Sequence, residues 1–226
     1  MKQLPLLLGP GPAQRFENFA VGANAVTVSA LRSVAPSSPP VYLWGPAGTG
    51  KTHLLRALAC EALGRGERVG AFGPSLEPPW SWGEGFELVL LDGCDDFDAA
   101  QQHAAFALFV EAATHGVPVA AAGRLPPVDL PVREDLRTRL GWGPVFQLLP
   151  LADAEVRAAL KREAERRGIA LSDEVTGYLL THFARDLGSL MALLDALDEF
   201  ALSEQRAVTV PLLKRMLAEQ AVKEGA

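Results

Sequence analysis

Short apolar runs alternate with helical patterns in the first part of the chain. The runs Val41 to Trp44 and Leu88 to Leu91 are uninterrupted, which is the pattern of parallel strands buried on both faces. Similar runs predict further strands at 69–72, 117–122 and 145–149. Apolar residues at helical spacing predict helices at 23–34, 52–63 and 98–115. This alternation indicates an α/β fold with a mostly parallel sheet.

The pattern changes after Pro150, where no further strand pattern follows. Helical spacing predicts helices at 153–167, 173–183 and 186–203. A last helix is expected to begin near Pro211, because proline is favoured in the first turn. We therefore expect three parts: a flexible tail at residues 1–12 that ends in a Gly/Pro-rich stretch, an α/β domain at 13–150 and a small all-helical domain at 151–226.

The most specific motif is a glycine-rich turn between the first strand and the next helix. It satisfies the phosphate-loop pattern G-x-x-x-x-G-K-[ST] with Gly45, Pro46, Ala47, Gly48, Thr49, Gly50, Lys51 and Thr52. The glycines let backbone N–H groups face phosphates, Lys51 supplies a charge at the β- and γ-phosphates, and the Thr52 hydroxyl can ligate Mg²⁺. The sequence therefore predicts a site for ATP or ADP with Mg²⁺.

A carboxylate follows the second buried strand. Asp92 stands where P-loop proteins place the acid that holds Mg²⁺. The next residue is Gly93, where many hydrolases of this class have a second carboxylate that orients the attacking water. Asp95 and Asp96 come too far along the chain to replace it, and we interpret them, with Asp98, as a solvated turn and a helix N-cap. Slow intrinsic hydrolysis is expected.

Composition narrows the classes of function. The chain has 226 residues, of which 49% are hydrophobic and 21% charged, so it is neither disordered nor built for a membrane. Its 21 basic and 27 acidic residues give a formal net charge of −6, which argues against a protein that mainly grips nucleic acid. The two cysteines, Cys60 and Cys94, lack partners at metal-ligand spacing, and a cytoplasmic location is expected.

In this order, the motifs resemble the AAA+ fold and, within it, the replication-initiator DnaA family. The segment 16–22 resembles the part of that family that borders the adenine, which implies nucleotide contacts from Val21 and Gly22. The segment 45–54 resembles its phosphate loop, including His53. The resemblance implies an AAA+ P-loop NTPase with a parallel sheet and a small all-helical lid domain.

Two arginine motifs extend the resemblance. The segment 137–143 resembles the family's box whose arginine reaches the nucleotide of a neighbouring subunit. This implies Arg139 as a finger acting in trans, with Arg137 in support. The segment 184–187 resembles the sensor motif of the family's lid, which implies that Arg185 responds to the nucleotide.

Two features separate the chain from the initiator itself. The nine residues after position 217, where the resemblance ends, are too few for a helix-turn-helix domain, so no sequence-specific DNA binding is expected. Gly123 stands where an active hydrolase of the family carries a polar sensor residue. Both Gly93 and Gly123 favour weak hydrolysis while leaving nucleotide binding intact.

The first residues resemble a peptide that binds the sliding clamp (β subunit) of DNA polymerase III. A glutamine amide orients such a peptide and leucines fill a preformed groove; the candidates are Gln3, Leu4, Leu6, Leu7 and Leu8. Together with a DnaA-like core, this implies a clamp-associated regulator that stimulates hydrolysis of ATP bound to DnaA. The resemblance favours ADP as its ligand and leaves a homo-oligomer open.

Two alternatives stay open. An independent AAA+ ATPase of the helicase-loader or transposition-helper type would need a basic groove and a complete hydrolytic set, which an acidic chain with Gly93 and Gly123 lacks. An adaptor that binds nucleotide only to stay folded would leave Arg139 without a function.

Overall fold

The computed structural model describes residues 14–183 and 186–224 of the chain. The chain divides into two compact units, one up to Leu149 and one from Pro150, each with hydrophobic clusters of its own. The first unit contains a sheet of five parallel strands in the order β2-β3-β4-β1-β5. These strands are β1 (Val41–Trp44), β2 (Arg68–Phe72), β3 (Phe86–Leu91), β4 (Val119–Gly123) and β5 (Val145–Gln147).

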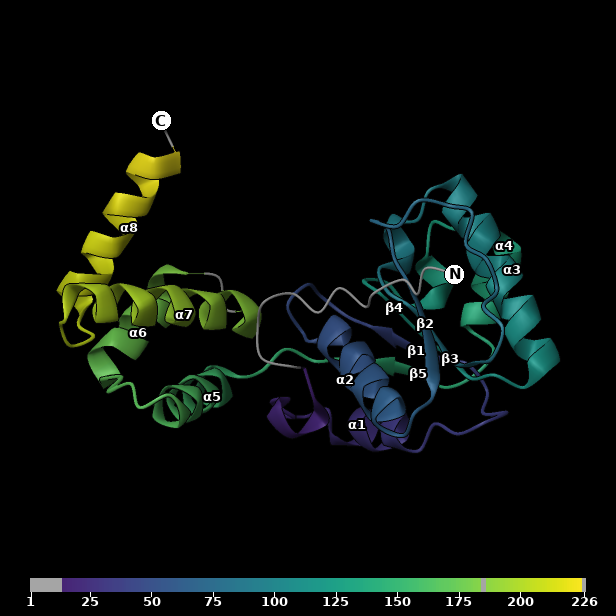
Figure 1. Cartoon of the computed structure of the whole chain (residues 1–226), viewed down its shortest axis with the longest axis horizontal. Coiled ribbons are helices and arrows are strands. Elements are labelled where there is room, and N and C mark those ends of the chain that lie inside the picture. The colour runs from purple at the N-terminus through teal and green to yellow at the C-terminus, as the bar shows by residue number, and fades with distance from the viewer. Residues whose placement is uncertain (1–13, 184–185, 225–226) are drawn as a thin grey trace. The chain divides into compact units, whose positions relative to one another are not determined.

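Helices cover both faces of this sheet (Figure 1). They are α1 (Ala25–Arg32), α2 (Lys51–Gly64), α3 (Ala99–His115) and α4 (Glu134–Leu140). Successive residues of a strand point to opposite faces. Leu88 and Leu90 of β3 therefore share one cluster with Leu31 of α1 and Leu54 of α2. Their neighbours in β3 belong to the other face.

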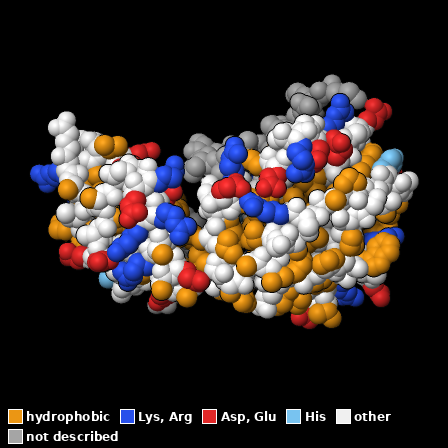
Figure 2. All heavy atoms as spheres, turned by 90° about the horizontal axis from the view of Figure 1, so that it is seen from below, with side chains coloured by type: hydrophobic (Ala, Val, Ile, Leu, Met, Phe, Trp, Pro, Cys, Tyr) orange, Lys and Arg blue, Asp and Glu red, His pale blue; other side chains and the backbone are white. Residues whose placement is uncertain are grey.

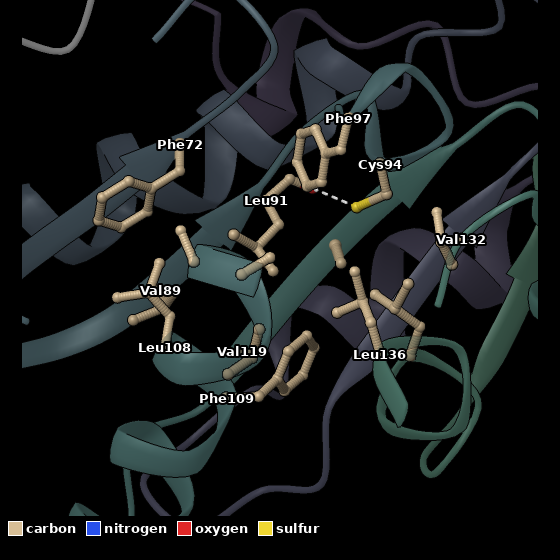
Figure 3. Packing of buried hydrophobic residues seen from close by; sticks show 14 of the residues in the cluster. Phe72, Val89, Leu91, Cys94, Phe97, Leu108, Phe109, Val119, Val132 and Leu136 are labelled. Atoms are coloured by element: carbon tan, nitrogen blue, oxygen red, sulfur yellow. Dashed lines mark hydrogen bonds between the residues drawn. The ribbon is translucent and has the colours of Figure 1, made fainter. Parts of the chain in front are cut away.

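The second face packs against α3 and α4. Figure 3 shows Val89 and Leu91 of β3 beside Leu108 and Phe109 of α3, with Leu136 of α4 in the same cluster. Both faces of the central strands are thus buried under helices, which is why β1, β4 and residues 88–91 of β3 are apolar. The prediction of an α/β fold with a parallel sheet is confirmed.

The sheet brings the carboxyl ends of three strands together. In the register of the sheet, Trp44 of β1 is opposite Gly123 of β4, and Leu91 of β3 is opposite Ala121 of β4. The loops that follow β1, β3 and β4 therefore begin at one edge. In open parallel sheets, ligands bind at this edge.

Two tryptophans anchor the long segment between β2 and β3. The ring centroid of Trp80 lies 5.3 Å from those of Phe72 and Phe97, and Trp80 is buried. Trp82 stacks on His115 at 5.2 Å. The irregular segment is consequently fastened to the α3 side of the sheet.

Helix α4 is the main departure from the predicted elements. The apolar pattern predicts no helix there, because seven residues offer only Leu136 and Leu140 as an i,i+4 pair. Both side chains are buried in the cluster that α3 covers, and this packing stabilises the short helix. Strand β5 ends at Gln147, two residues before the end of the predicted strand.

The second unit is helical within its described residues. Its helices are α5 (Asp153–Arg166), α6 (Asp173–His182), α7 (Leu187–Glu204) and α8 (Val210–Glu224). Ser172 caps α6 by accepting a hydrogen bond from the N–H of Val175, and Asp186 caps α7 in the same way through Ser189. Apolar side chains from all four helices form the core of this unit.

The described helices are not of the kind that crosses a membrane. Within residues 14–183 and 186–224, no helix combines the length and the apolarity that a bilayer span requires.

Candidate functional site

The glycine-rich loop joins β1 to α2 and folds back tightly on the sheet. Gly45, Gly48 and Gly50 have φ angles of 148°, 76° and 91°, where side chains are strongly disfavoured. A Cβ atom at Gly45 would overlap the carbonyl oxygen of Leu148, and one at Gly50 would lie 2.6 Å from the ring of Phe19. Two independent constraints, backbone angle and space, therefore require glycine at these positions.

The middle of the loop is open to solvent. Pro46, Ala47 and Gly48 are exposed, so the loop presents its backbone outward from the end of β1. The hydroxyl of Thr49 donates a hydrogen bond of 2.9 Å to the carbonyl oxygen of Pro46 and fixes the turn. This leaves backbone groups of the loop accessible at the carboxyl edge of the sheet.

Lys51 lies folded over the same loop. Its Nζ donates hydrogen bonds of 2.7 Å to the carbonyl oxygens of Gly45 and Pro46. Burial lowers the pKa of Lys51, and the nearby carboxylates of Asp92 and Asp95 oppose this shift. The ammonium group is thus held at the place where the motif puts a phosphate-binding charge.

Thr52 and Asp92 are brought together. The Thr52 hydroxyl donates a hydrogen bond of 2.6 Å to the Oδ2 of Asp92, although 40 residues separate them in the sequence. A hydroxyl and a carboxylate are oxygen donors of the type that Mg²⁺ takes together with water and phosphate oxygens. These two residues therefore fit the coordination of a Mg²⁺ that arrives with a nucleotide.

The segment before α1 lies against the start of α2. His53 donates from Nε2 to the carbonyl oxygen of Arg15 at 2.9 Å, and its ring centroid lies 5.4 Å from that of Phe19. Burial lowers the pKa of His53, which keeps the ring neutral. Val21 and Gly22 form the turn between this segment and α1. His53 thus holds the segment in which the predicted adenine contacts lie.

Asn24 fastens the same segment to the end of the first unit. Its buried side chain donates a hydrogen bond of 3.0 Å to the carbonyl oxygen of Leu149 and accepts one of 2.8 Å from the Leu149 N–H. This two-way amide contact fixes the residue at which the first unit ends. No local sequence pattern indicates this contact, because Asn24 and Leu149 are 125 residues apart.

The structure corrects the interpretation of Asp95 as part of a solvated turn. Its side chain is only 4% exposed, and it accepts a hydrogen bond of 2.8 Å from the backbone N–H of Arg124. The guanidinium of Arg124 also pairs with Asp95 and with the more exposed Asp96. Burial acts to raise the pKa of Asp95, but the hydrogen bonds from Arg124 outweigh it, and the pKa is lowered. Asp98 caps α3, as predicted.

Gly123 at the end of β4 has no room for a side chain. A Cβ atom there would overlap the hydroxyl of Tyr42 and lie 2.9 Å from Oδ1 of Asp95. The Tyr42 hydroxyl donates a hydrogen bond of 3.0 Å to the carbonyl oxygen of Leu125. The missing sensor side chain thus has a physical cause, because the ring of Tyr42 fills its place.

The two arginines of α4 do not reach the loop. Among the described contacts, none joins Arg137 or Arg139 to residues 45–52. The Cζ of Arg139 lies 5.0 Å from the centroid of the Trp142 ring, and Trp142 is 66% exposed. A Cβ atom at Gly143 would overlap the carbonyl oxygen of Pro40, so the turn after Trp142 requires glycine. Arg139 is half-buried, and its guanidinium lies over a largely exposed ring.

Two groups of predicted site residues cannot be placed. Arg185 lies outside the described residues, as do the candidates for clamp binding at positions 3, 4, 6, 7 and 8.

Family models match both units of the chain. A model described as the bacterial DnaA ATPase domain matches residues 12–69, and one described as "Hda, lid domain" matches residues 153–217. These matches cover the phosphate loop and the core helices of the second unit.

Known proteins are similar over nearly the whole length. An uncharacterized protein from Haemophilus influenzae is 34% identical, with 96% of this chain and 98% of the relative covered. Domain III of the replication initiation protein DnaA from Thermotoga maritima has a TM-score of 0.77 at 20% identity, covering 92% of this chain and 97% of that chain. AMPPCP-bound DnaA from Aquifex aeolicus has a TM-score of 0.65 at 24% identity, covering 82% of this chain and 66% of that chain.

Sequence motifs, fold and family models thus agree. The phosphate loop joins β1 of the parallel sheet to helix α2. The second unit matches a lid domain. The chain therefore belongs to the DnaA-related AAA+ proteins and is Hda-like.

Proposed function

We propose that this chain is a clamp-associated negative regulator of replication initiation in the cytoplasm. It binds an adenine nucleotide and stimulates hydrolysis of the ATP bound to DnaA, with Arg139 as a finger that acts in trans. Its own hydrolysis is weak. The DnaA-like fold and the Hda-type lid support a partnership with DnaA.

The observation that carries this proposal is the surface pair of Arg139 and Trp142. The guanidinium lies over an exposed indole ring, and no carboxylate of the described residues pairs with it. Arg133, which directly precedes α4, is by contrast paired with Asp135 at 2.7 Å. A cation that no carboxylate of the described residues neutralises is available to an anion on another molecule.

The chemistry in trans is electrostatic. As ATP is cleaved, charge spreads over the oxygens of the transferred phosphoryl group, and an arginine supplied by a neighbour stabilises it. In other systems such a finger is worth about 10³ to 10⁵ in rate. Arg137, two residues before Arg139 in α4, would support this contact, as the resemblance to the family's arginine box implies.

This chain's own nucleotide site would use the loop described above. Backbone N–H groups of residues 47–50 and the Lys51 ammonium would hold the phosphates, and Thr52 and Asp92 would ligate Mg²⁺, which neutralises phosphate charge. Val21, Gly22 and His53 would border the base, and Arg185 would respond from the lid. The fold shared with AMPPCP-bound DnaA supports ATP or ADP as the ligand.

Two glycines at the carboxyl edge of the sheet support the proposal that intrinsic hydrolysis is weak. Gly93 carries no carboxylate to orient water, and Tyr42 leaves no space for a polar side chain at Gly123. In addition, Figure 2 shows basic and acidic side chains interspersed on one face, without a continuous basic groove there. Both observations favour a regulator over an independent helicase-loader type of ATPase.

The test is ATP hydrolysis by DnaA of the same organism, with this protein and with or without DNA-loaded sliding clamp. Stimulation that requires the clamp, with little activity from this protein alone, is the expected result. Rapid hydrolysis by this protein alone, unaffected by DnaA and clamp, would identify an independent ATPase instead.

Matched variants separate the parts of the proposal. Arg139→Ala should remove most of the stimulation, whereas Arg133→Ala, which changes an arginine already paired with Asp135, should retain it.

Trp142→Ala should lower the stimulation by about two- to fivefold, because an exposed cation–π contact contributes about 0.5–1 kcal/mol. Trp142→Phe, which keeps an aromatic ring, should restore most of the stimulation. Gln3→Ala should abolish the clamp-dependent stimulation, because the variant would no longer bind the clamp. Full stimulation by Arg139→Ala would refute the assignment of the finger.

A further inference from the structure

Arg124 emerges at the phosphate end of the candidate nucleotide site. Its strand, β4, pairs with β1, and Gly123 is opposite Trp44, the residue before the phosphate loop. Asp92 follows the strand on the other side of β4. Arg124 thus begins at the carboxyl edge of the sheet, where the phosphate loop and Asp92 also follow their strands.

Arg124 makes separate contacts through its backbone and through its side chain. The backbone N–H is fixed by the buried Oδ1 of Asp95, at 2.8 Å. The guanidinium itself is 57% exposed and pairs with Asp95 and Asp96. The main chain is therefore anchored while the charged end is accessible to solvent and to a competing anion.

Charge at this edge is unevenly distributed. Three carboxylates, those of Asp92, Asp95 and Asp96, lie with two cations, Lys51 and Arg124. The charges of Asp92, Asp95 and Arg124 all influence the ionisation of Lys51, so these groups lie within electrostatic range of it. A terminal phosphate added here brings further negative charge and competes with the aspartates for the exposed guanidinium.

We propose that Arg124 binds the terminal phosphate of ATP by leaving Asp96 and the side-chain contact with Asp95, and that it remains paired with these aspartates when ADP is bound. Asp95 and Asp96 then act as the resting partners of Arg124, and Asp95 keeps the main chain in register through the Arg124 N–H. The exchange makes Arg124 a residue that distinguishes ATP from ADP at a site whose sensor position is occupied by glycine. This inference rests on the proposed nucleotide site, but not on the action of Arg139.

The experiment is equilibrium binding of Mg²⁺-ADP and Mg²⁺-AMPPCP to the full chain by isothermal titration calorimetry. Arg124→Ala should weaken the binding of AMPPCP by roughly 10- to 100-fold, because hydrogen bonds from a charged group are lost. The binding of ADP should weaken by less than about threefold. Asp96→Asn removes one competing, exposed carboxylate and should strengthen AMPPCP relative to ADP by about two- to fivefold. Arg65→Ala, which breaks the surface pair with Glu67, is the control and should leave both affinities unchanged.

Each other outcome contradicts the inference. Equal losses for both nucleotides in Arg124→Ala would assign Arg124 a structural role at the edge of the sheet, and unchanged affinities would remove it from the site. If Arg124→Ala does not fold, Arg124→Gln and Asp96→Asn test the same difference between nucleotides. Binding of neither nucleotide by the wild-type chain would refute the proposed nucleotide site as well, whereas wild-type binding without the predicted discrimination would refute only this inference.

Discussion

The hydroxyl of Tyr42 occupies the space that a side chain at position 123 would need. Tyr42 is fully buried, and burial strongly raises its pKa, so the hydroxyl stays protonated and donates to the Leu125 carbonyl. That hydrogen bond fixes the turn after β4 from which Arg124 projects. At the scale of single residues, glycine at 123 and tyrosine at 42 therefore depend on each other.

Gly123→Ala should destabilise the first unit by about 1–3 kcal/mol, because an added methyl group must displace the Tyr42 hydroxyl. When Tyr42 is also changed to Phe, Gly123→Ala should destabilise the first unit less. The difference gives an interaction energy between positions 42 and 123 of at least about 0.5 kcal/mol. Urea denaturation of the single and double variants measures this coupling.

The control for that series is Gly64→Ala at the end of α2, where no atom lies within 4 Å of the added Cβ. This change should be neutral or slightly stabilising. Purely additive costs at positions 42 and 123 would mean that the two residues do not compete for the same space.

At the scale of elements, α5 is connected to its neighbours through a charge network. Glu163 accepts hydrogen bonds from Arg166 and Arg167 of the same chain segment, and Arg167 also pairs with Asp195 of α7. Burial acts against the charged form, but the two guanidinium groups lower the pKa of Glu163 to about 2. A second pair, between Lys161 and Asp173 at 2.6 Å, links α5 to α6.

The network predicts a pH-dependent stability of the second unit. A carboxylate whose pKa is lower in the folded state stabilises the fold above its unfolded pKa of about 4.5, and this contribution is lost as the pH falls towards 2. Glu163→Gln should therefore reduce the free energy of unfolding at pH 7, and the difference from wild type should disappear between pH 4.5 and 2. Thermal unfolding followed by circular dichroism gives both quantities.

Glu165→Gln is the matched control, since Glu165 is exposed on the same helix. It should change stability little at any pH. A constant difference between Glu163→Gln and wild type down to pH 2 would argue against the network.

Most elements follow from local pattern, whereas parts of the candidate site do not. Strand β1 has the predicted limits, because an apolar run ends at a glycine turn, and α3 begins after the predicted cap Asp98. Helix α4 was missed because its stability comes from packing on α3. The burial of Asp95 depends on Arg124, 29 residues later, and no local pattern reports such a distant partner.

At the scale of the whole molecule, the two units can be followed by different signals. The four tryptophans, Trp44, Trp80, Trp82 and Trp142, all belong to the first unit. The second unit is helical in its described part and contributes to far-ultraviolet circular dichroism. Tryptophan fluorescence therefore reports on the unit that carries the phosphate loop.

Mg²⁺-ADP should stabilise the first unit. At a concentration 100 times the Kd, a ligand that binds only the folded state adds about 2.7 kcal/mol. The tryptophan-detected urea midpoint should rise accordingly in the wild type, and Lys51→Ala should abolish the rise. An equal rise in Lys51→Ala would place the bound nucleotide elsewhere.

The strand order also has a consequence for synthesis on the ribosome. Among the described residues, β1 pairs only with β4 and β5, so the strand that precedes the phosphate loop has no partner when it emerges. By contrast, β2 and β3 follow each other closely in the sequence and pair with each other. The last residue of β1 meets Gly123 about 80 residues later, which at about 5–20 residues synthesised per second means a delay of roughly 4–16 s. During that time both edges of β1 are unpaired. Pauses in translation before β4 should therefore favour aggregation of this chain and its binding by chaperones.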